Sequence, residues 1–364
     1  MNPIKIVTIL GARPQFVKAG ALSRKLKTEK EIEEILVHTG QHYDNAMSEV
    51  FFNELQLPKP QYNLALGGLS HGAMTGRMIE KIEEILNQEK PHFTLVYGDT
   101  DSTLAGALAS VKLQIPIIHI EAGLRSFNNA MPEEINRILT DRISKILFVP
   151  TTNAMQNLKN EGFLNFDCRI IQSGDIMQDV ALHYAQFAKA PAMDLSKEFA
   201  LCTIHRAENT DSIHRLQEIF AGLSVIAKQI QIILPLHPRT RKILEQNHIV
   251  IPQGIVVVAP LGYLEMIWLL RFCKMVLTDS GGLQKEAYFF KKPCLVLRNE
   301  TEWIELIEKG YNVIVGANKE KIIQGFLKIA DNSSMEFCRT LYGEGKAAEI
   351  IIQTIKEEVC KKLY

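Results

Sequence analysis

The sequence predicts an α/β protein with two Rossmann-like, doubly wound domains and a cleft between them. Two observations lead to this fold class. Short β-branched runs alternate with longer amphipathic stretches along the chain, a pattern typical of parallel sheets covered by helices on both faces. The chain also has 364 residues, which corresponds to about two domains at roughly 150 residues each.

The first half of the chain contains one set of alternating strands and helices. Strands are predicted at residues 5–10, 35–38, 93–97, 115–120, 146–149 and 170–172. The helical patterns between them include residues 15–27, 71–87 and 133–144. A mixed segment, residues 173–197, follows the last of these strands and is the expected join to a second domain.

The second half repeats this alternation of strands and helices, which favours two separate sheets over one large sheet. Its predicted strands are residues 199–204, 230–236, 255–258, 275–278, 293–297 and 313–315. Helical patterns between them include residues 212–229 and 264–272. In such a pair of domains the ligand faces the carboxyl ends of the strands, so the loops after strands are the places to look for chemistry.

The composition is that of a globular chain with balanced charge. Lys plus Arg number 41 and Asp plus Glu also number 41, whereas dedicated nucleic-acid or anionic-membrane binders usually carry a basic excess. No segment approaches the about 18 apolar residues of a membrane-spanning helix, and the N-terminus lacks the cleavage site of a signal peptide. The six cysteines form no C-x-x-C pair, which favours reduced core residues and a cytoplasmic protein.

The loop after the first strand, residues 11–15, is a candidate phosphate site. Gly11 permits a tight turn, and Pro14 suits the first position of a helix. Arg13 adds a charged fork to the free N–H groups of the helix end. The G-x-G-x-x-G fingerprint of dinucleotide binding is absent. The alternative is a helix-entry turn that carries a surface arginine.

A matching loop, residues 278–286, follows a strand in the second half. Ser280, Gly281 and Gly282 would expose a hydroxyl and N–H groups to an anion. Glu286 lies one helical turn further on, where its carboxylate could accept both hydroxyls of a ribose. The alternative is a capped helix with a solvated glutamate.

Three acidic segments are candidates for proton transfer. Asp99 and Glu121 each follow a strand, and Glu133 and Glu134 open a helix. Carboxylates that converge raise one another's pKa, which suits proton transfer near neutral pH. Asp99 could instead be an N-cap, and the two glutamates could complement the helix dipole, which we favour for Glu134. Asp99-Thr100-Asp101 also matches the D-x-D metal motif of some glycosyltransferases, but we expect no metal.

Two further strand ends carry basic residues. His205 lies in the polar segment Thr203–Asn209, which is typical of a site loop. His237 and Arg239 form another strand-end loop that could face an anion.

Together these segments resemble the non-hydrolysing UDP-N-acetylglucosamine 2-epimerases of bacteria. The matching pieces are GARPQ, VYGDTDSTLA, HIEAGLRS, PEEINR, TIHRAEN, LPLHPRTR, LTDSGGLQKEA and YGEGKAAEII. They span the chain from Gly11 to about Ile352, and their order makes the set specific.

The resemblance implies a GT-B-like fold with the active site between the domains. Residues 1–175 would form an N-terminal domain with the catalytic carboxylates, and residues 176–345 a C-terminal domain that binds UDP. Residues 346–364 would be a helix that packs back on the first domain. The expected partners are a UDP-sugar and a second copy of the chain, and surface polysaccharide is the implied destination of the product.

The resemblance also implies the reaction, inversion at C2 of a UDP-linked 2-acetamido sugar without a redox cofactor. UDP would leave by anti-elimination to give a 2-acetamidoglucal, and would add again after protonation of C2 on the opposite face. The implied catalytic residues are Asp99, Glu121, Glu133 and His205. The implied substrate contacts are Arg13, Lys18, Gln41, His42, Arg137, His237, Ser280, Gly281, Gly282, Glu286 and Arg298.

This chemistry agrees with the residues of the strand-end loops. The C2 proton is weakly acidic, so a base must act as UDP departs, and the leaving group needs fixed positive partners. Arg13, His205 and the helix end at Ser280 could supply them. We hypothesise that Asp99 and Glu121 exchange the C2 proton.

The sequence departs from the common bacterial pattern in two places. Tyr43 stands where allosteric members usually have Arg, which puts a second, activating UDP-GlcNAc site in doubt. GARPQ replaces the commoner GTRPE and is closer to a branch that acts on UDP-2,3-diacetamido-2,3-dideoxy-glucuronate. A uronate would need another cationic contact, for which Arg125 and Arg239 are candidates.

Alternatives remain in other classes. A GT-B glycosyltransferase would share the fold but would need an acceptor. A catalytically silent sensor would bind UDP without exchanging the C2 proton. A hydrolysing 2-epimerase would release free sugar, but it usually has an acidic residue after the arginine of the first loop, where this chain has Pro14.

Overall fold

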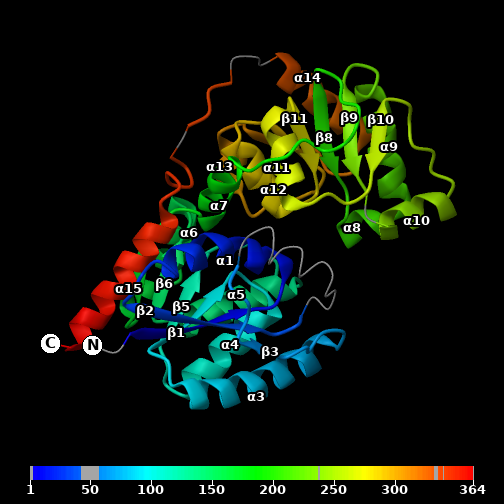
Figure 1. Ribbon diagram of the computed structural model, residues 1–364. Coiled ribbons are helices and arrows are strands. Elements are labelled where there is room, and N and C mark those ends of the chain that lie inside the picture. Colours follow the sequence, from blue (N-terminus) through cyan, green and yellow to red (C-terminus); the bar gives the residue numbers. More distant parts are fainter. Residues whose placement is uncertain (1–2, 42–56, 237, 332–334, 339, 364) are drawn as a thin grey trace. The chain divides into compact units, whose positions relative to one another are not determined.

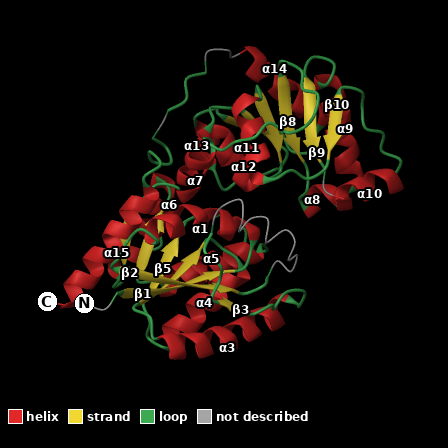
Figure 2. Cartoon of the chain, viewed as in Figure 1, coloured by secondary structure: helices red, strands yellow, loops and turns green. Residues whose placement is uncertain are grey.

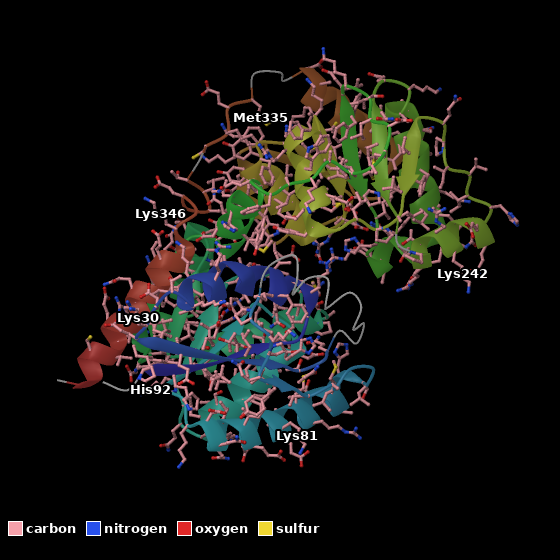
Figure 3. The ribbon with its side chains drawn as sticks, in the orientation of Figure 1. Lys30, Lys81, His92, Lys242, Met335 and Lys346 are labelled. Atoms are coloured by element: carbon pink, nitrogen blue, oxygen red, sulfur yellow. The ribbon has the colours of Figure 1, made fainter. Side chains whose placement is uncertain are left out.

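The chain divides into two units, and each is described by itself. Unit 1 comprises Met1–His183 and Arg339–Tyr364, and unit 2 comprises Tyr184–Cys338. The computed structural model describes residues 3–41, 57–236, 238–331, 335–338 and 340–363 (Figure 1). Charged side chains such as Lys81 and Lys242 extend from the outer helices (Figure 3).

Unit 1 is built on a parallel sheet with a Rossmann-like strand order. In the described residues the order is β3-β2-β1-β4-β5-β6-β7. Strands β2 and β3 are added on one side of β1 and strands β4 to β7 on the other, so the order of the parallel strands reverses between β1 and β4. That reversal is where ligands of doubly wound folds bind. The strands are β1 (Ile4–Leu10), β2 (Ile32–His38), β3 (Tyr62–Asn63), β4 (Phe93–Tyr97), β5 (Ile117–Ile120), β6 (Ile146–Val149) and β7 (Arg169–Gln172).

Helices cover both faces of this sheet, as Figure 2 shows. Val7 and Ile9 of β1 pack with α3 and α4 in one apolar core. Thr8, between them, points to the opposite face and reaches Glu34, which also bonds to Ser23 of α1. The helices are α1 (Arg13–Leu26), α3 (His71–Glu89), α4 (Asp101–Lys112), α5 (Pro132–Ile143), α6 (Thr152–Asn160), the 3₁₀ turn η1 (Phe163–Asn165), α7 (Ile176–Tyr184) and α15 (Ala347–Leu363).

Unit 2 repeats this architecture with the order β10-β9-β8-β11-β12-β13, and its reversal lies between β8 and β11. Helices α9 and α14 pack on one face, and α11 and α12 on the other. Its strands are β8 (Phe199–Thr203), β9 (Gln231–Pro235), β10 (Ile255–Val258), β11 (Met275–Thr278), β12 (Cys294–Val296) and β13 (Asn312–Ile314). Its helices are α8 (Ala207–Thr210), α9 (Ile213–Ile226), α10 (Pro238–Gln246), α11 (Tyr263–Phe272), α12 (Gly281–Phe289), α13 (Ile304–Glu308) and α14 (Lys319–Asp331).

The prediction of two parallel-sheet α/β domains is confirmed. The limits of the two units differ from the expected 175/176 and 345/346. The chain leaves unit 1 after His183, because α7 belongs with α15. Asp179 of α7 accepts hydrogen bonds from the backbone N–H groups of Ala347 and Ala348, which open α15. Helix α15 also contacts α1, with ion pairs from Lys25 to Glu349 and from Lys356 to Glu29.

Several predicted element limits were wrong for local reasons. β2 begins at Ile32 rather than residue 35, because Glu34 belongs to the strand and its carboxyl accepts from buried hydroxyls. β5 begins at Ile117 rather than residue 115, since Pro116 cannot donate to the sheet and Ile115 bonds back to Ser110.

Within the described residues the cysteines form no disulfide, and three of them, Cys202, Cys273 and Cys294, are buried, as predicted. Burial raises the pKa of the Cys202 thiol and, to about 12, that of Cys273. In the described ranges, each helix is too short or too polar to span a bilayer.

Glu34 gives the stability of the chain a predictable pH dependence. Burial, opposed by the hydrogen bonds from Thr8 and Ser23, raises the pKa of the Glu34 carboxyl from 4.5 to about 7. Between these two pH values the folded chain holds a proton that the unfolded chain releases. The contribution of Glu34 to the free energy of unfolding is therefore fully present below about pH 4.5 and is lost as the pH rises through about 7. The loss amounts to about 3 kcal/mol at 1.36 kcal/mol per pKa unit.

We therefore expect Glu34→Gln, which is neutral at every pH, to gain stability relative to the natural chain as pH rises. Urea unfolding of both proteins at pH 5 and pH 8 measures this difference. Between pH 5 and pH 8, the free energy of unfolding of the variant should rise relative to that of the natural chain by about 3 kcal/mol at most. An equal difference at both pH values would contradict the burial of an ionisable carboxyl at this position.

Candidate active site

The side chain of Gln15 holds the loop after β1 in place by hydrogen bonds to its backbone. Its side-chain oxygen accepts from the backbone N–H groups of Gly11 and Ala12, at 2.8 and 3.0 Å. Its amide nitrogen donates to the Tyr97 carbonyl and to Thr103 Oγ1, which joins the β1 and β4 loops. Two N–H groups that the sequence assigned to an anion are therefore used within unit 1, while the Arg13 side chain is exposed.

Gly11 is required by close approach rather than by a tight turn. Its φ is not positive, but an added Cβ would lie 2.0 Å from Thr39 Oγ1 and 2.1 Å from Ser102 Oγ. These two hydroxyls are hydrogen-bonded to each other at 2.8 Å. Gln41, predicted to bind substrate, uses its side-chain oxygen to accept from Ser102 N and Oγ.

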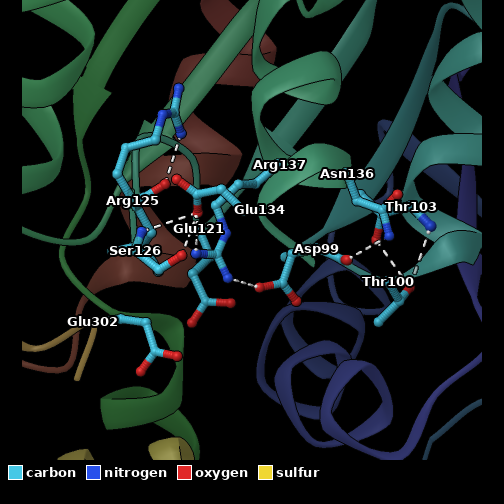
Figure 4. Close-up of polar contacts among 12 residues, drawn as sticks. Asp99, Thr100, Thr103, Glu121, Arg125, Ser126, Glu134, Asn136, Arg137 and Glu302 are labelled. Carbon is cyan, nitrogen blue, oxygen red and sulfur yellow. Dashed lines mark hydrogen bonds and ion pairs between the residues drawn. The ribbon is translucent and has the colours of Figure 1, made fainter. Parts of the chain in front are cut away.

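Asp99 follows β4 and is held by Arg137 of α5 (Figure 4). Arg137 is 4% exposed and also donates to Glu134, at 2.7 Å. Glu134 is fully buried and accepts from Ser126 and Phe127 as well. Glu134 thus anchors a loop and an arginine, a role beyond the helix-dipole one that we favoured. The N-cap of α4 is Thr100, so the N-cap alternative for Asp99 was wrong.

Asp101 has its own partners, distinct from those of the Asp99 carboxylate. Its carboxylate accepts from Asn136 Nδ2 at 3.1 Å and lies 2.7 Å from His71 Nδ1. Asn136 also donates to the Asp99 carbonyl at 2.9 Å. The two carboxylates of the D-x-D tripeptide therefore contact different groups. Within the described residues, no cluster of three or more metal-ligating side chains occurs.

Glu121, after β5, pairs with Lys18 of α1. Both side chains are nearly buried, at 9% and 10% exposed. Glu121 also has a φ of 70°, in the left-handed region that a residue with a side chain rarely adopts. Such strain is typical of functional positions. Gly98, with a φ of 62°, leaves room for this pair, since an added Cβ would lie about 3 Å from both charged groups.

Three other predicted site residues of unit 1 have different outcomes. Glu133 is half-buried at the start of α5, and within the described residues it forms no ion pair. Arg125 is 3% exposed and pairs with Asp141 and Glu161, so it is not open to a uronate. His42 lies outside the described residues, as does Tyr43.

In unit 2, the loop after β8 is held by the buried carboxylate of Asp279, at the end of β11. Asp279 accepts from the backbone N–H groups of His205 and Arg206 and from Asn209 Nδ2, all within 3.1 Å. His205 Nδ1 lies 3.4 Å from the same carboxylate, and the His205 side chain is 51% exposed. Asp279 thus fixes the backbone of His205, while about half of the His205 side chain stays exposed.

The start of α12 has the features expected of an anion site. Ser280 caps the helix through its hydroxyl. An added Cβ at Gly282 would meet no atom within 4 Å, and one at Gly281 would make only ordinary contacts. Neither glycine has a positive φ. Because neither glycine has a side chain, the N–H groups at the start of α12 stay accessible to an anion.

The other predicted contacts of unit 2 are engaged within the unit. Glu286 is 8% exposed and accepts from Tyr263 Oη at 3.0 Å. Arg298 is 3% exposed and pairs with Glu302 at 3.0 Å. Arg239 is exposed and pairs with Asp211. His237 lies outside the described residues.

Sequence reasoning missed the residues that hold the site together. They lie within or near the quoted motifs, but their partners are far along the chain. A helical face provides one signal, because Glu134, Arg137 and Asp141 recur at three- and four-residue spacing. Of these three, Arg137 was predicted as a substrate contact and Glu134 as a helix-dipole residue, and Asp141 was missed. Also missed were His71, His119, Asn136, Tyr263 and Asp279, together with the structural role of Asp101.

Comparisons with known proteins identify the family of this chain. The family model described as UDP-N-acetylglucosamine 2-epimerase matches residues 24–356. The UDP-2,3-diacetamido-2,3-dideoxy-D-glucuronate 2-epimerase of Pseudomonas aeruginosa is 52% identical, over 96% of this chain and 99% of that protein.

Solved structures give the same result. The UDP-GlcNAc 2-epimerase of Methanocaldococcus jannaschii, in complex with UDP-GlcNAc and UDP, has a TM-score of 0.87 at 40% identity, over 97% of this chain and 99% of that one. The Neisseria meningitidis enzyme bound to UDP-GlcNAc has a TM-score of 0.86 at 29% identity, over 97% of this chain and 100% of that one. The chain therefore belongs to the UDP-N-acetylglucosamine 2-epimerase family.

Proposed function

We propose that this isomerase inverts C2 of UDP-2,3-diacetamido-2,3-dideoxy-D-glucuronate without hydrolysis. The observation that carries the choice of substrate is the 52% identity, over nearly the full length of both proteins, to the Pseudomonas aeruginosa epimerase of that name. Identity to relatives named for UDP-N-acetylglucosamine is lower. It is 49% for a UDP-N-acetylglucosamine 2-epimerase homolog of Methanococcus maripaludis, 40% for the Methanocaldococcus jannaschii epimerase and 30% for that of Escherichia coli.

Unit 1 supplies the groups that move the C2 proton. Asp99 and Glu121 follow adjacent strands, β4 and β5, whose carboxyl ends lie at the same edge of the sheet. Arg137 pairs with Asp99 and Lys18 pairs with Glu121, and these ion pairs orient the two carboxyl groups. One carboxylate removes the C2 proton as UDP departs, and the other returns a proton on the opposite face.

Unit 2 holds UDP and stabilises it as the leaving group. The open N-terminus of α12 binds the diphosphate through backbone N–H groups, and the exposed imidazole of His205 adds a donor. Glu286 shares its carboxylate between Tyr263 and the ribose hydroxyls. Elimination leaves a 2-acetamidoglucal, to which UDP adds again after protonation.

We expect Gly282→Leu to weaken UDP binding at least about 30-fold, because the new side chain occupies the approach to the α12 N–H groups. Calorimetric titration with UDP measures the effect. Since a Cβ here meets no atom of unit 2, the melting temperature should not fall. Gly76→Leu, at another exposed glycine with free space around it, is the matched control. Unchanged UDP affinity in Gly282→Leu would place UDP elsewhere.

The choice of substrate is tested by kcat/KM for the diacetamido uronate and for UDP-GlcNAc, measured side by side. We expect a preference for the uronate of at least about 100-fold, because a site built to pair a carboxylate loses that interaction with a neutral sugar. A preference for UDP-GlcNAc would reject the uronate while leaving C2 epimerisation intact. Of the two arginines considered for this contact, Arg239 stays a candidate, and Arg125 is excluded by its burial.

The cellular setting follows from the substrate. A UDP-sugar is made and used in the cytoplasm, where unpaired cysteines also persist. We expect the protein to act there as a homodimer and to feed surface-polysaccharide synthesis, including lipopolysaccharide. Sedimentation of the purified protein would measure its oligomeric state.

A further inference from the structure

His119 lies in a buried group of charged side chains between two loops of unit 1. Its Nδ1 is 2.7 Å from Asp141 Oδ1, and its Nε2 is 2.7 Å from the carbonyl oxygen of Gly98. The His119 and Asp141 side chains are both fully buried. His119 therefore joins helix α5, which carries Asp141, to the loop after β4.

Asp141 extends the connection to the loop after β5. Its second oxygen accepts from the backbone N–H of Gly123 at 3.1 Å and from Arg125 Nη1 at 2.7 Å. Arg125 also binds both oxygens of Glu161 on α6, at 2.7 and 2.8 Å. Hydrogen bonds and ion pairs thus fix the loop after β5 to α5 and to Glu161 at the end of α6.

The hydrogen-bond partners of His119 hold its ring from both sides. The Gly98 carbonyl oxygen can only accept, so Nε2 donates to it. Nδ1 lies against the Asp141 carboxyl, whose pKa is raised by burial but lowered overall by the hydrogen bond and charge of His119 and by the charge of Arg125. The ring therefore cannot turn without losing a buried hydrogen bond.

This arrangement links the two chain segments that carry the candidate catalytic carboxylates. Gly98 immediately precedes Asp99, and Gly123 is two residues after Glu121. His119 bonds to one loop directly and to the other through Asp141. The same helix, α5, carries Arg137, the partner of Asp99.

We propose that His119 is a positioning residue for epimerisation, holding the Asp99 and Glu121 loops at the spacing that two-face proton transfer at C2 needs. The inference rests on the proposed function. Since a misplacement of about 1 Å can cost about 100-fold in rate, loss of His119 lowers kcat and leaves UDP binding in unit 2 unchanged.

The test uses two variants of the full-length protein that each keep half of the connection. In His119→Asn the amide nitrogen replaces Nδ1 and keeps the bond to Asp141. In His119→Gln it replaces Nε2 and keeps the bond to Gly98. For both we expect kcat to fall about 100-fold, while KM for the UDP-sugar and the affinity for UDP stay within about threefold of the natural chain.

Two further variants separate positioning from stability. Asp141→Asn can accept from Gly123 and Arg125 through its oxygen and donate to His119, so it keeps every bond and should retain kcat within about tenfold. Asp179→Asn alters another buried carboxylate of unit 1, which fastens α15 instead of the site loops. It should lose stability and keep its kcat, measured well below its melting temperature.

The outcomes are distinct. A near-natural kcat in both His119 variants, or an equal loss in Asp179→Asn, overturns the positioning role. A combined loss of kcat and UDP affinity also overturns it. If the natural chain epimerises neither UDP-sugar, the proposed function fails, and this inference fails with it.

Discussion

Asp99→Asn should lower kcat by at least about 1000-fold and abolish uptake of solvent deuterium at C2. General acid–base catalysis contributes about 10²–10⁴-fold, and an amide can neither take up nor release the C2 proton. The side chain of Asp99 is 32% exposed, against 9% for Glu121, so Asp99 is accessible to a substrate.

The fold and the UDP site should survive this change. Arg137 keeps its bond to Glu134, and the proposed UDP contacts lie in unit 2. We therefore expect the UDP affinity to stay within about threefold. Asp167→Asn, in which a 97%-exposed carboxylate on the surface of unit 1 is replaced, serves as the control and should be fully active. Natural rates of C2 exchange in Asp99→Asn would remove Asp99 from the reaction.

Glu121→Gln should lower kcat by a similar factor and should also destabilise unit 1. The variant removes the carboxylate from Lys18, which is 8% exposed, and breaking a buried ion pair costs about 3–5 kcal/mol. Activity is measured by epimer formation, and stability by urea unfolding.

A double variant separates the two effects. Lys18→Met with Glu121→Gln removes both buried charges and should regain most of the lost stability, but none of the activity. If the double variant regained activity as well, Glu121 would be a structural partner of Lys18 and would have no part in proton transfer.

The strand and helix pattern was predictable because parallel sheets buried on both faces leave a strong apolar signal. β8 and β11 were placed to within one residue for this reason. Where a strand departs from that signal, the prediction fails. The three residues Ile32–Glu34 were missed because two glutamates interrupt the run, although buried hydroxyls satisfy one of them. β3 was missed because a strand of two residues has no period.

The site was predictable as a set of strand-end loops, but its internal contacts were not. Asp99 and Glu121 stood out because acidic residues directly follow apolar strands. Nothing local shows that Arg137 bonds to Asp99, 38 residues away. For the same reason, the sequence did not show that Lys18, Arg137 and Arg298, which the resemblance assigned to the substrate, each pair with a carboxylate of their own unit.

The account is tested most directly by proton NMR of the natural chain with UDP-2,3-diacetamido-2,3-dideoxy-D-glucuronate in deuterated buffer. We predict that the C2 proton signal is lost to deuterium and that both C2 epimers accumulate, still linked to UDP. Retention of the C2 proton in the product, or release of free sugar, would contradict it.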